Sequence, residues 1–177
     1  MDIEQLRYPI GKLVRPEHIS AEDLKKWIEE IGSIPAKLRA AVSRLTDEQL
    51  DTPYRPDGWT VRQVVHHMAD SHMNSFIRFK LALTEDNPTI KPYEEAAWAE
   101  LPDAKTAPIE SSLEILDGLH KRWVLLLSNM SEEDLKRTFF HPGYKTTNSL
   151  AMSVNLYRWH GFHHLAHITG LIERSGW

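Results

Sequence analysis

The segment NSLAMSVNLYRWHGFHHLAHITGLIER, residues 148–174, predicts a long helix near the end of the chain. Its apolar residues recur at intervals of three and four positions, the spacing that places them on one face of a helix. The same segment holds four histidines within residues 160–167: His160, His163, His164 and His167. Such a helix must bury its apolar face against neighbouring helices, so the rest of the chain should supply them.

Two earlier segments carry helix start signals. Ser20 precedes an acidic turn and is expected to cap a helix that Pro35 interrupts and that resumes to about Leu45. Thr60 begins a capping box with Gln63, which predicts a second helix to about residue 83.

A third helix is expected over residues 109–129, where leucines and Trp123 recur at helical spacing. The proline-rich segment 84–107 before it indicates a long loop. No run of alternating polar and apolar residues indicates a strand. Four long helices with these connections predict an all-α four-helix bundle.

The chain is expected to form one domain over residues 20–177. Residues 1–19 contain Pro9, Gly11 and Pro16 and show no clear period, so we expect an extended N-terminal arm lying on that domain. The bundle itself contains an internal similarity. Capped turns at residues 46–50 and 131–135 are each followed by a Pro-Gly-aromatic bend and a histidine-bearing helix. This pattern favours a pseudo-two-fold pair of helical hairpins, although recurrent turn chemistry would produce it too.

The net charge, the apolar content and the absence of cysteine limit the classes of function that the chain can have. The net charge is −4 with no block of basic residues, which argues against nucleic-acid binding. No stretch approaches the roughly 20 apolar residues of a membrane span, and the N-terminus lacks a signal-peptide pattern. The chain has no cysteine, which fits a reducing cytoplasm and leaves only nitrogen and oxygen ligands for a metal. Ten histidines in 177 residues is the excess that needs an explanation.

Helical periodicity selects two histidines in the last helix. With the apolar face centred about 80° from His160, His164 lies at about 40° and inside that face. His163 and His167 lie at about 300° and 340°, towards the polar side. His160 and His164 are therefore the inward pair, at i and i+4, close enough to share one metal ion. Hydrogen-bonded core histidines remain the alternative.

The second helix contains HHMADSH, residues 66–72, and periodicity does not choose a third ligand from it. His72 lies well inside the apolar face, His67 lies at its border and His66 points outward. His72 could be a ligand or a core histidine whose ring is hydrogen-bonded.

The chain resembles the DinB-like superfamily, metal-binding four-helix bundles, in Gly58-Trp59-Thr60, in HHMADSH and in the closing HGFHH. It is similar to a Bacillus-type group named as metal-dependent hydrolases and bacillithiol S-transferases. The resemblance implies a divalent metal, zinc or nickel, held by His67, His160 and His164. It also implies a homodimer and a small-molecule substrate.

Three histidine ligands leave a coordination position open for chemistry. Gly161 follows His160 where a metalloprotease would carry glutamate, so that activity is excluded. Three functions remain: an S-transferase that activates a low-molecular-weight thiol such as bacillithiol, a hydrolase that uses metal-bound hydroxide, and a non-enzymatic metal or ligand binder. Tyr157 faces inward and is a candidate for contacting substrate, with simple packing as its alternative.

Overall fold

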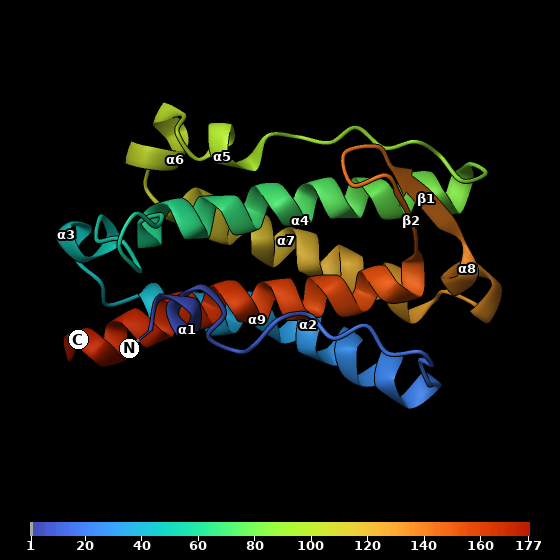
Figure 1. The fold of residues 1–177 in the computed structure, drawn as a ribbon, viewed down its shortest axis with the longest axis horizontal. Coiled ribbons are helices and arrows are strands. Elements are labelled where there is room, and N and C mark those ends of the chain that lie inside the picture. Colours follow the sequence, from blue (N-terminus) through green and yellow to red (C-terminus); the bar gives the residue numbers. More distant parts are fainter. Residues whose placement is uncertain (1) are drawn as a thin grey trace.

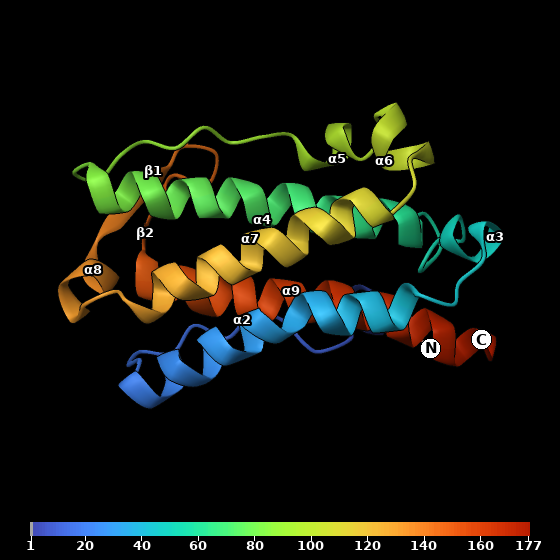
Figure 2. The same cartoon turned by 180° about the vertical axis from the view of Figure 1, so that it is seen from behind.

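The computed structural model describes residues 2–177 and is an all-α four-helix bundle, which confirms the predicted fold class (Figures 1 and 2). The long helices are α2 (Ala21–Val42), α4 (Val61–Thr84), α7 (Glu110–Ser128) and α9 (Leu150–Ser175). Short elements join them: α1 (Ile3–Arg7), α3 (Asp47–Leu50), α5 (Glu95–Trp98), α6 (Pro102–Thr106), α8 (Glu132–Lys136), β1 (Thr138–His141) and β2 (Thr146–Ser149). None of the helices in this range has the length and apolar character needed to cross a membrane.

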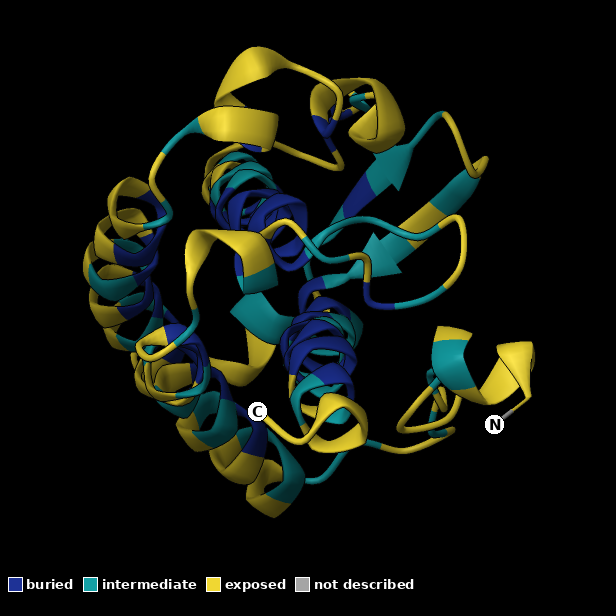
Figure 3. Ribbon diagram, turned by 90° about the vertical axis from the view of Figure 1, so that its left-hand side faces the viewer, coloured by how far each residue is buried: buried dark blue, intermediate teal, exposed yellow. Residues whose placement is uncertain are grey.

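The long helices turn their apolar faces towards a shared interior, which Figure 3 shows as buried ribbon at the centre. Helix α2 packs on α7 and α9, and α4 packs on the same two helices. Leu38, Val64, Leu116 and Ile168 bring one fully buried residue from each helix into this core. The periodicity of apolar residues along each helix therefore accounts for the packing.

Helix α2 is continuous through Pro35, contrary to the expected interruption. A proline removes one helical hydrogen bond, the one that its missing N–H would donate to residue 31. Ile31, Ile34 and Leu38 are fully buried around it, and their packing offsets this local loss. The carbonyl of Ile31 is left without its usual helical donor.

A short antiparallel hairpin, β1 and β2, lies before α9 and was not expected. Its strands have four residues each and pair Thr138 with Ser149 and His141 with Thr146. Strands this short, largely polar in β2, do not show a readable alternation of burial. Phe140 also exchanges backbone hydrogen bonds with Pro88 and Ile90, which attaches the long loop to the hairpin.

The two halves of the bundle share one order of elements, as the internal similarity indicated. Thr46 and Ser131 each form a capping box at the start of a short helix, α3 and α8. Thr60 and Ser149 then cap the long helices α4 and α9. Antiparallel pairing of the backbone precedes both α4 and α9. Before α4 it is a single bridge between Pro53 and Thr60, and before α9 it is the hairpin of β1 and β2.

The N-terminal segment runs along α9 (Figure 1) and contains a helix, α1, that its sequence pattern did not predict. The Asn155 side chain donates to the carbonyl of Val14 at 2.9 Å, and Trp159 Nε1 donates to that of Gly11 at 3.1 Å. His167 Nε2 lies 3.1 Å from the carbonyl of Arg7. These bonds attach the segment to the face of α9 that bears the extra histidines.

Candidate metal centre

Three histidines converge between α4 and α9. His67, His160 and His164 each offer a nitrogen, and these atoms all lie within 4.8 Å of one another. The Nε2 atoms of His67 and His160 are 3.3 Å apart. The two α9 rings have centroids 4.5 Å apart, as expected for residues one helical turn apart.

Helix α9 can hold this pair close to the core because a glycine lies between the two histidines. A Cβ at Gly161 would collide with the side chain of Ile34 on α2. The absence of a side chain therefore lets α9 approach α2 closely.

The three rings have the protonation state that metal binding needs. Burial lowers the pKa of His67 to about 4 and holds the pKa values of His160 and His164 well below the usual 6.5. All three imidazoles are neutral at neutral pH, with a lone pair available on each ring. Three neutral imidazole nitrogens fit a divalent ion such as zinc or nickel.

His72 lies outside this cluster, behind one of its members. Its ring is fully buried, as periodicity predicted, and its Nε2 lies 3.2 Å from Nδ1 of His160. The structure therefore brings His67 to the cluster and gives His72 a contact with the cluster instead. His67 lies at the border of the apolar face of α4, and its side chain still reaches α9 because α4 and α9 pack together.

His120 on α7 belongs to the same arrangement and was missed by the sequence reasoning. Its Nε2 lies 2.8 Å from Nδ1 of His72, and its Nδ1 lies 2.8 Å from the carbonyl of Ile31. The sequence does contain a signal that His120 is buried. His120 follows Leu116 by four residues and precedes Trp123 by three, so it shares their buried face.

Three expectations about exposure are wrong. His66 is buried, with Nδ1 2.7 Å from Ser112 Oγ, because α6 and the start of α7 cover that face of α4. His163 and His167 are also buried instead of facing solvent. The N-terminal segment covers them, and the Tyr54 ring stacks on His167 at 4.0 Å between centroids. A helical wheel considers one helix only, so it cannot predict that segments distant in the sequence bury one of its faces.

Trp59 forms an apolar wall beside the cluster. Its ring centroid lies 4.7 Å from that of His67 and 6.4 Å from that of His164. Trp59 is thus a packing residue at the site. Tyr144, at the matching bend of the second half, is instead largely exposed.

A cavity of about 740 Å³ opens onto His160. Ser71 and Tyr157 line it next to the cluster, and Tyr157 is otherwise buried, with its ring centroid 5.6 Å from that of His160. Arg15 and Arg78 supply positive charge to the lining, and Glu94 and Glu95 supply negative charge. A small molecule can therefore lie within reach of the histidine cluster.

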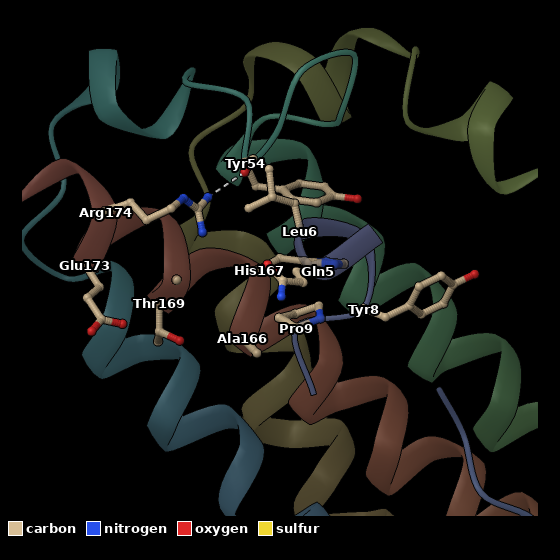
Figure 4. Close-up of a pocket in the computed structure, with 11 residues that line it drawn as sticks. Gln5, Leu6, Tyr8, Pro9, Tyr54, Ala166, His167, Thr169, Glu173 and Arg174 are labelled. Carbon is tan, nitrogen blue, oxygen red and sulfur yellow. Dashed lines mark hydrogen bonds between the residues drawn. The ribbon is translucent and has the colours of Figure 1, made fainter. Parts of the chain in front are cut away.

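A second cavity, of about 660 Å³, lies between α1 and the end of α9 (Figure 4). Its lining includes His167 and Arg174, and Arg174 donates to the carbonyl of Tyr54 at 2.8 Å. His67, His160 and His164 do not line it. Of these two cavities, only the one of about 740 Å³ reaches the cluster, at His160.

Comparison with known proteins identifies the family and the fold of the chain. The sequence profile of the DinB superfamily matches residues 32–168. A "putative metal-dependent hydrolase" of Bacillus mycoides is 57% identical over 175 residues, covering 99% of this chain and 100% of the relative. YfiT of Bacillus subtilis, also named a "putative metal-dependent hydrolase", is 55% identical over 172 residues, 97% of each chain.

The solved structure of YfiT superposes with a TM-score of 0.96 and covers 98% of this chain and 99% of its own. It is described as a probable metal-dependent hydrolase with an unusual four-helix bundle topology. The chain therefore belongs to the DinB superfamily, among relatives named for metal-dependent hydrolysis and with a buried cluster of three histidines.

Proposed function

We propose that the protein is a divalent-metal-dependent S-transferase that joins a low-molecular-weight thiol, such as bacillithiol, to a small electrophile. The observation that carries this proposal is a cluster made only of histidines, one of which, His160, lines a 740 Å³ cavity. A divalent cation held by three imidazoles keeps a coordination position open and lowers the pKa of a thiol or water that binds there.

His67, His160 and His164 would hold the cation, and the surrounding side chains shape the site. Trp59 covers one side of the cluster and limits the access of water. Arg15 and Arg78 provide charge that would bind an anionic thiol. Tyr93 lines the cavity, and its hydroxyl, whose pKa is raised by burial, can donate a hydrogen bond to substrate.

The surroundings of the cluster favour thiol transfer over hydrolysis. Within residues 2–177, no carboxylate hydrogen-bonds to His67, His160 or His164. Hydrolysis of an ester or amide usually relies on a general base. A thiol needs less help, because its pKa already lies near 8.5.

Hydrolysis is the second candidate, because the relatives carry that name. Two carboxylates, Glu94 and Glu95, line the cavity and are the residues that could act as a base after substrate binds. If hydrolysis is the reaction, Glu94→Gln or Glu95→Gln should lower kcat strongly. Thiol transfer predicts little change from either substitution.

The decisive experiment combines the metal-loaded protein with monochlorobimane in the presence and absence of bacillithiol. We expect accelerated conjugation only when protein, metal and thiol are all present. Chelation of the metal and the His164→Ala variant are the matched controls, and both should return the rate to background. Turnover of esters or amides without thiol would contradict the proposal and support hydrolysis. A large loss of melting temperature on chelation, with no turnover of any substrate, would support a purely structural metal.

A further inference from the structure

We propose that His120 and His72 are positioning residues that fix the tautomer of His160, so that its Nε2 atom presents a lone pair to the metal centre. The chain of contacts begins at the carbonyl of Ile31 on α2 and runs through His120 on α7 and His72 on α4 to His160 on α9, so it involves all four long helices. The inference rests on the metal centre proposed above and does not depend on which reaction occurs there.

The first step is the carbonyl of Ile31 in α2. In an α-helix this oxygen accepts a hydrogen bond from the N–H of residue 35, four positions later. Residue 35 is proline and has no N–H, so the oxygen is free for another donor. Nδ1 of His120 lies 2.8 Å away. A carbonyl can only accept, so the proton of His120 must be on Nδ1.

In the second step, the position of the proton on His120 determines the position of the proton on His72 and then on His160. A neutral His120 with its proton on Nδ1 has a lone pair on Nε2, which faces Nδ1 of His72 at 2.8 Å. His72 must therefore donate from Nδ1 and accept at Nε2. That atom faces Nδ1 of His160 at 3.2 Å. His160 donates from Nδ1, and its lone pair is on Nε2, the atom that faces His67.

The burial of His72 and His120 keeps the protons on these ring nitrogens. His72 and His120 have almost no exposed surface, and the Trp123 ring packs against both, with centroids 5.9 Å and 5.8 Å away. Without water, a ring cannot exchange its hydrogen-bond partner easily. By contrast, Nδ1 of His164 is buried without a partner in the described structure. The protein therefore orients the His160 ring more firmly than the His164 ring.

The direct test is an NMR measurement on metal-free protein labelled with ¹⁵N-histidine. Long-range ¹H–¹⁵N correlations report which ring nitrogen carries the proton. We expect His120, His72 and His160 all to carry it on Nδ1. A proton on Nε2 of His160 in the metal-free protein would overturn the inference, whatever the metal affinity proves to be.

Variants separate positioning from packing. His120→Leu keeps an apolar volume but removes the acceptor for His72, and we expect Zn²⁺ affinity to fall about 10–100-fold, the usual effect of losing a partner of a metal ligand. His120→Gln places an amide oxygen near the position of Nε2 and should restore most of the affinity. His66→Leu removes another buried, hydrogen-bonded histidine from α4 and should leave the affinity within about threefold of the unsubstituted protein.

Pro35→Ala tests the start of the chain without removing a histidine. Alanine supplies an N–H that competes with His120 for the carbonyl of Ile31. We expect weaker Zn²⁺ binding and a mixed tautomer at His160, while the melting temperature of the metal-free protein does not fall. Unchanged tautomers and affinity in both Pro35→Ala and His120→Leu would refute the inference. Failure of the transferase assay would not, because the tautomers are measured without substrate or metal.

Discussion

Nε2 of His67 on α4 lies 3.3 Å from Nε2 of His160 on α9, although the two residues are 93 positions apart. Two nitrogen lone pairs at this distance repel each other unless a proton or a cation lies between them. The bundle therefore brings its two halves together at a point that favours a shared cation, and the packing of α4 on α9 determines that point.

Removal of a cluster histidine should abolish metal binding. We expect His160→Ala and His164→Ala to lose stoichiometric Zn²⁺ binding in isothermal titration, because two imidazoles seldom hold such an ion tightly. His163→Ala and His167→Ala are the controls on the same helix and should keep most of it. Equal losses in all four variants would show that α9, and not the cluster, had been disturbed.

Substitution of His67 should weaken metal binding far more than substitution of His72. His67→Ala removes a nitrogen of the cluster itself and should abolish binding, whereas His72→Ala removes only a contact to His160 and should cost about 10–100-fold. Titration of both metal-free variants ranks them directly. The reverse order would mean that His72 is the ligand and that the cluster rearranges around it.

The His120 ring should make stability depend on pH. Burial lowers its pKa from 6.5 to about 4, so between these values the unfolded chain binds a proton that the folded chain does not. Its contribution is complete above pH 6.5 and is lost as the pH falls towards 4. Between pH 7 and pH 5 the free energy of unfolding should drop by about 2 kcal/mol because of this ring.

Urea unfolding of the metal-free protein at the two pH values measures this drop. The His120→Gln variant has no ring to titrate, so its stability should fall by about 2 kcal/mol less over the same range. The prediction fails if both proteins lose the same amount.

The close approach of α9 to α2 should make Gly161 intolerant of a side chain. Gly161→Ala places a Cβ against Ile34 and should destabilise the protein by about 1–3 kcal/mol. Gly118→Ala in α7 meets no neighbour within 4 Å and should stabilise it by about 0.5–1 kcal/mol. Adding Ile34→Val to Gly161→Ala should recover part of the melting temperature, because it removes the methyl group that collides most closely.

The arginines of the cavity should affect thiol binding and leave metal binding unchanged. We expect Arg78→Gln to raise the KM for bacillithiol about tenfold or more, the effect of losing a hydrogen bond to a charged group. The KM for the electrophile is the internal control and should change little. A parallel rise in both constants would indicate a distorted cavity instead of a lost anion contact.

Much of the architecture was determined by local sequence. Apolar spacing and the caps at Ser20 and Thr60 predicted the long helices, and burial of one face of each helix predicted their bundle. The inward position of His72 followed from the same periodicity. These features depend on residues three or four positions apart, which the sequence displays directly.

Other features depended on chain that is distant in sequence. The N-terminal segment covers His163 and His167, and α6 with the start of α7 covers His66, so a single-helix wheel assigned all three to the wrong environment. The hairpin before α9 was missed because its strands are too short to show a period.

The histidine content and the inward pair on α9 could be determined from the sequence alone, whereas periodicity left the third member of the cluster open between His67 and His72. Only the tertiary structure brought His67 to α9 and placed His72 and His120 behind His160. The physical reason is that a metal cluster depends on distances between side chains of separate helices. Those distances are set by helix packing, such as the contact at Gly161, and not by spacing along one helix.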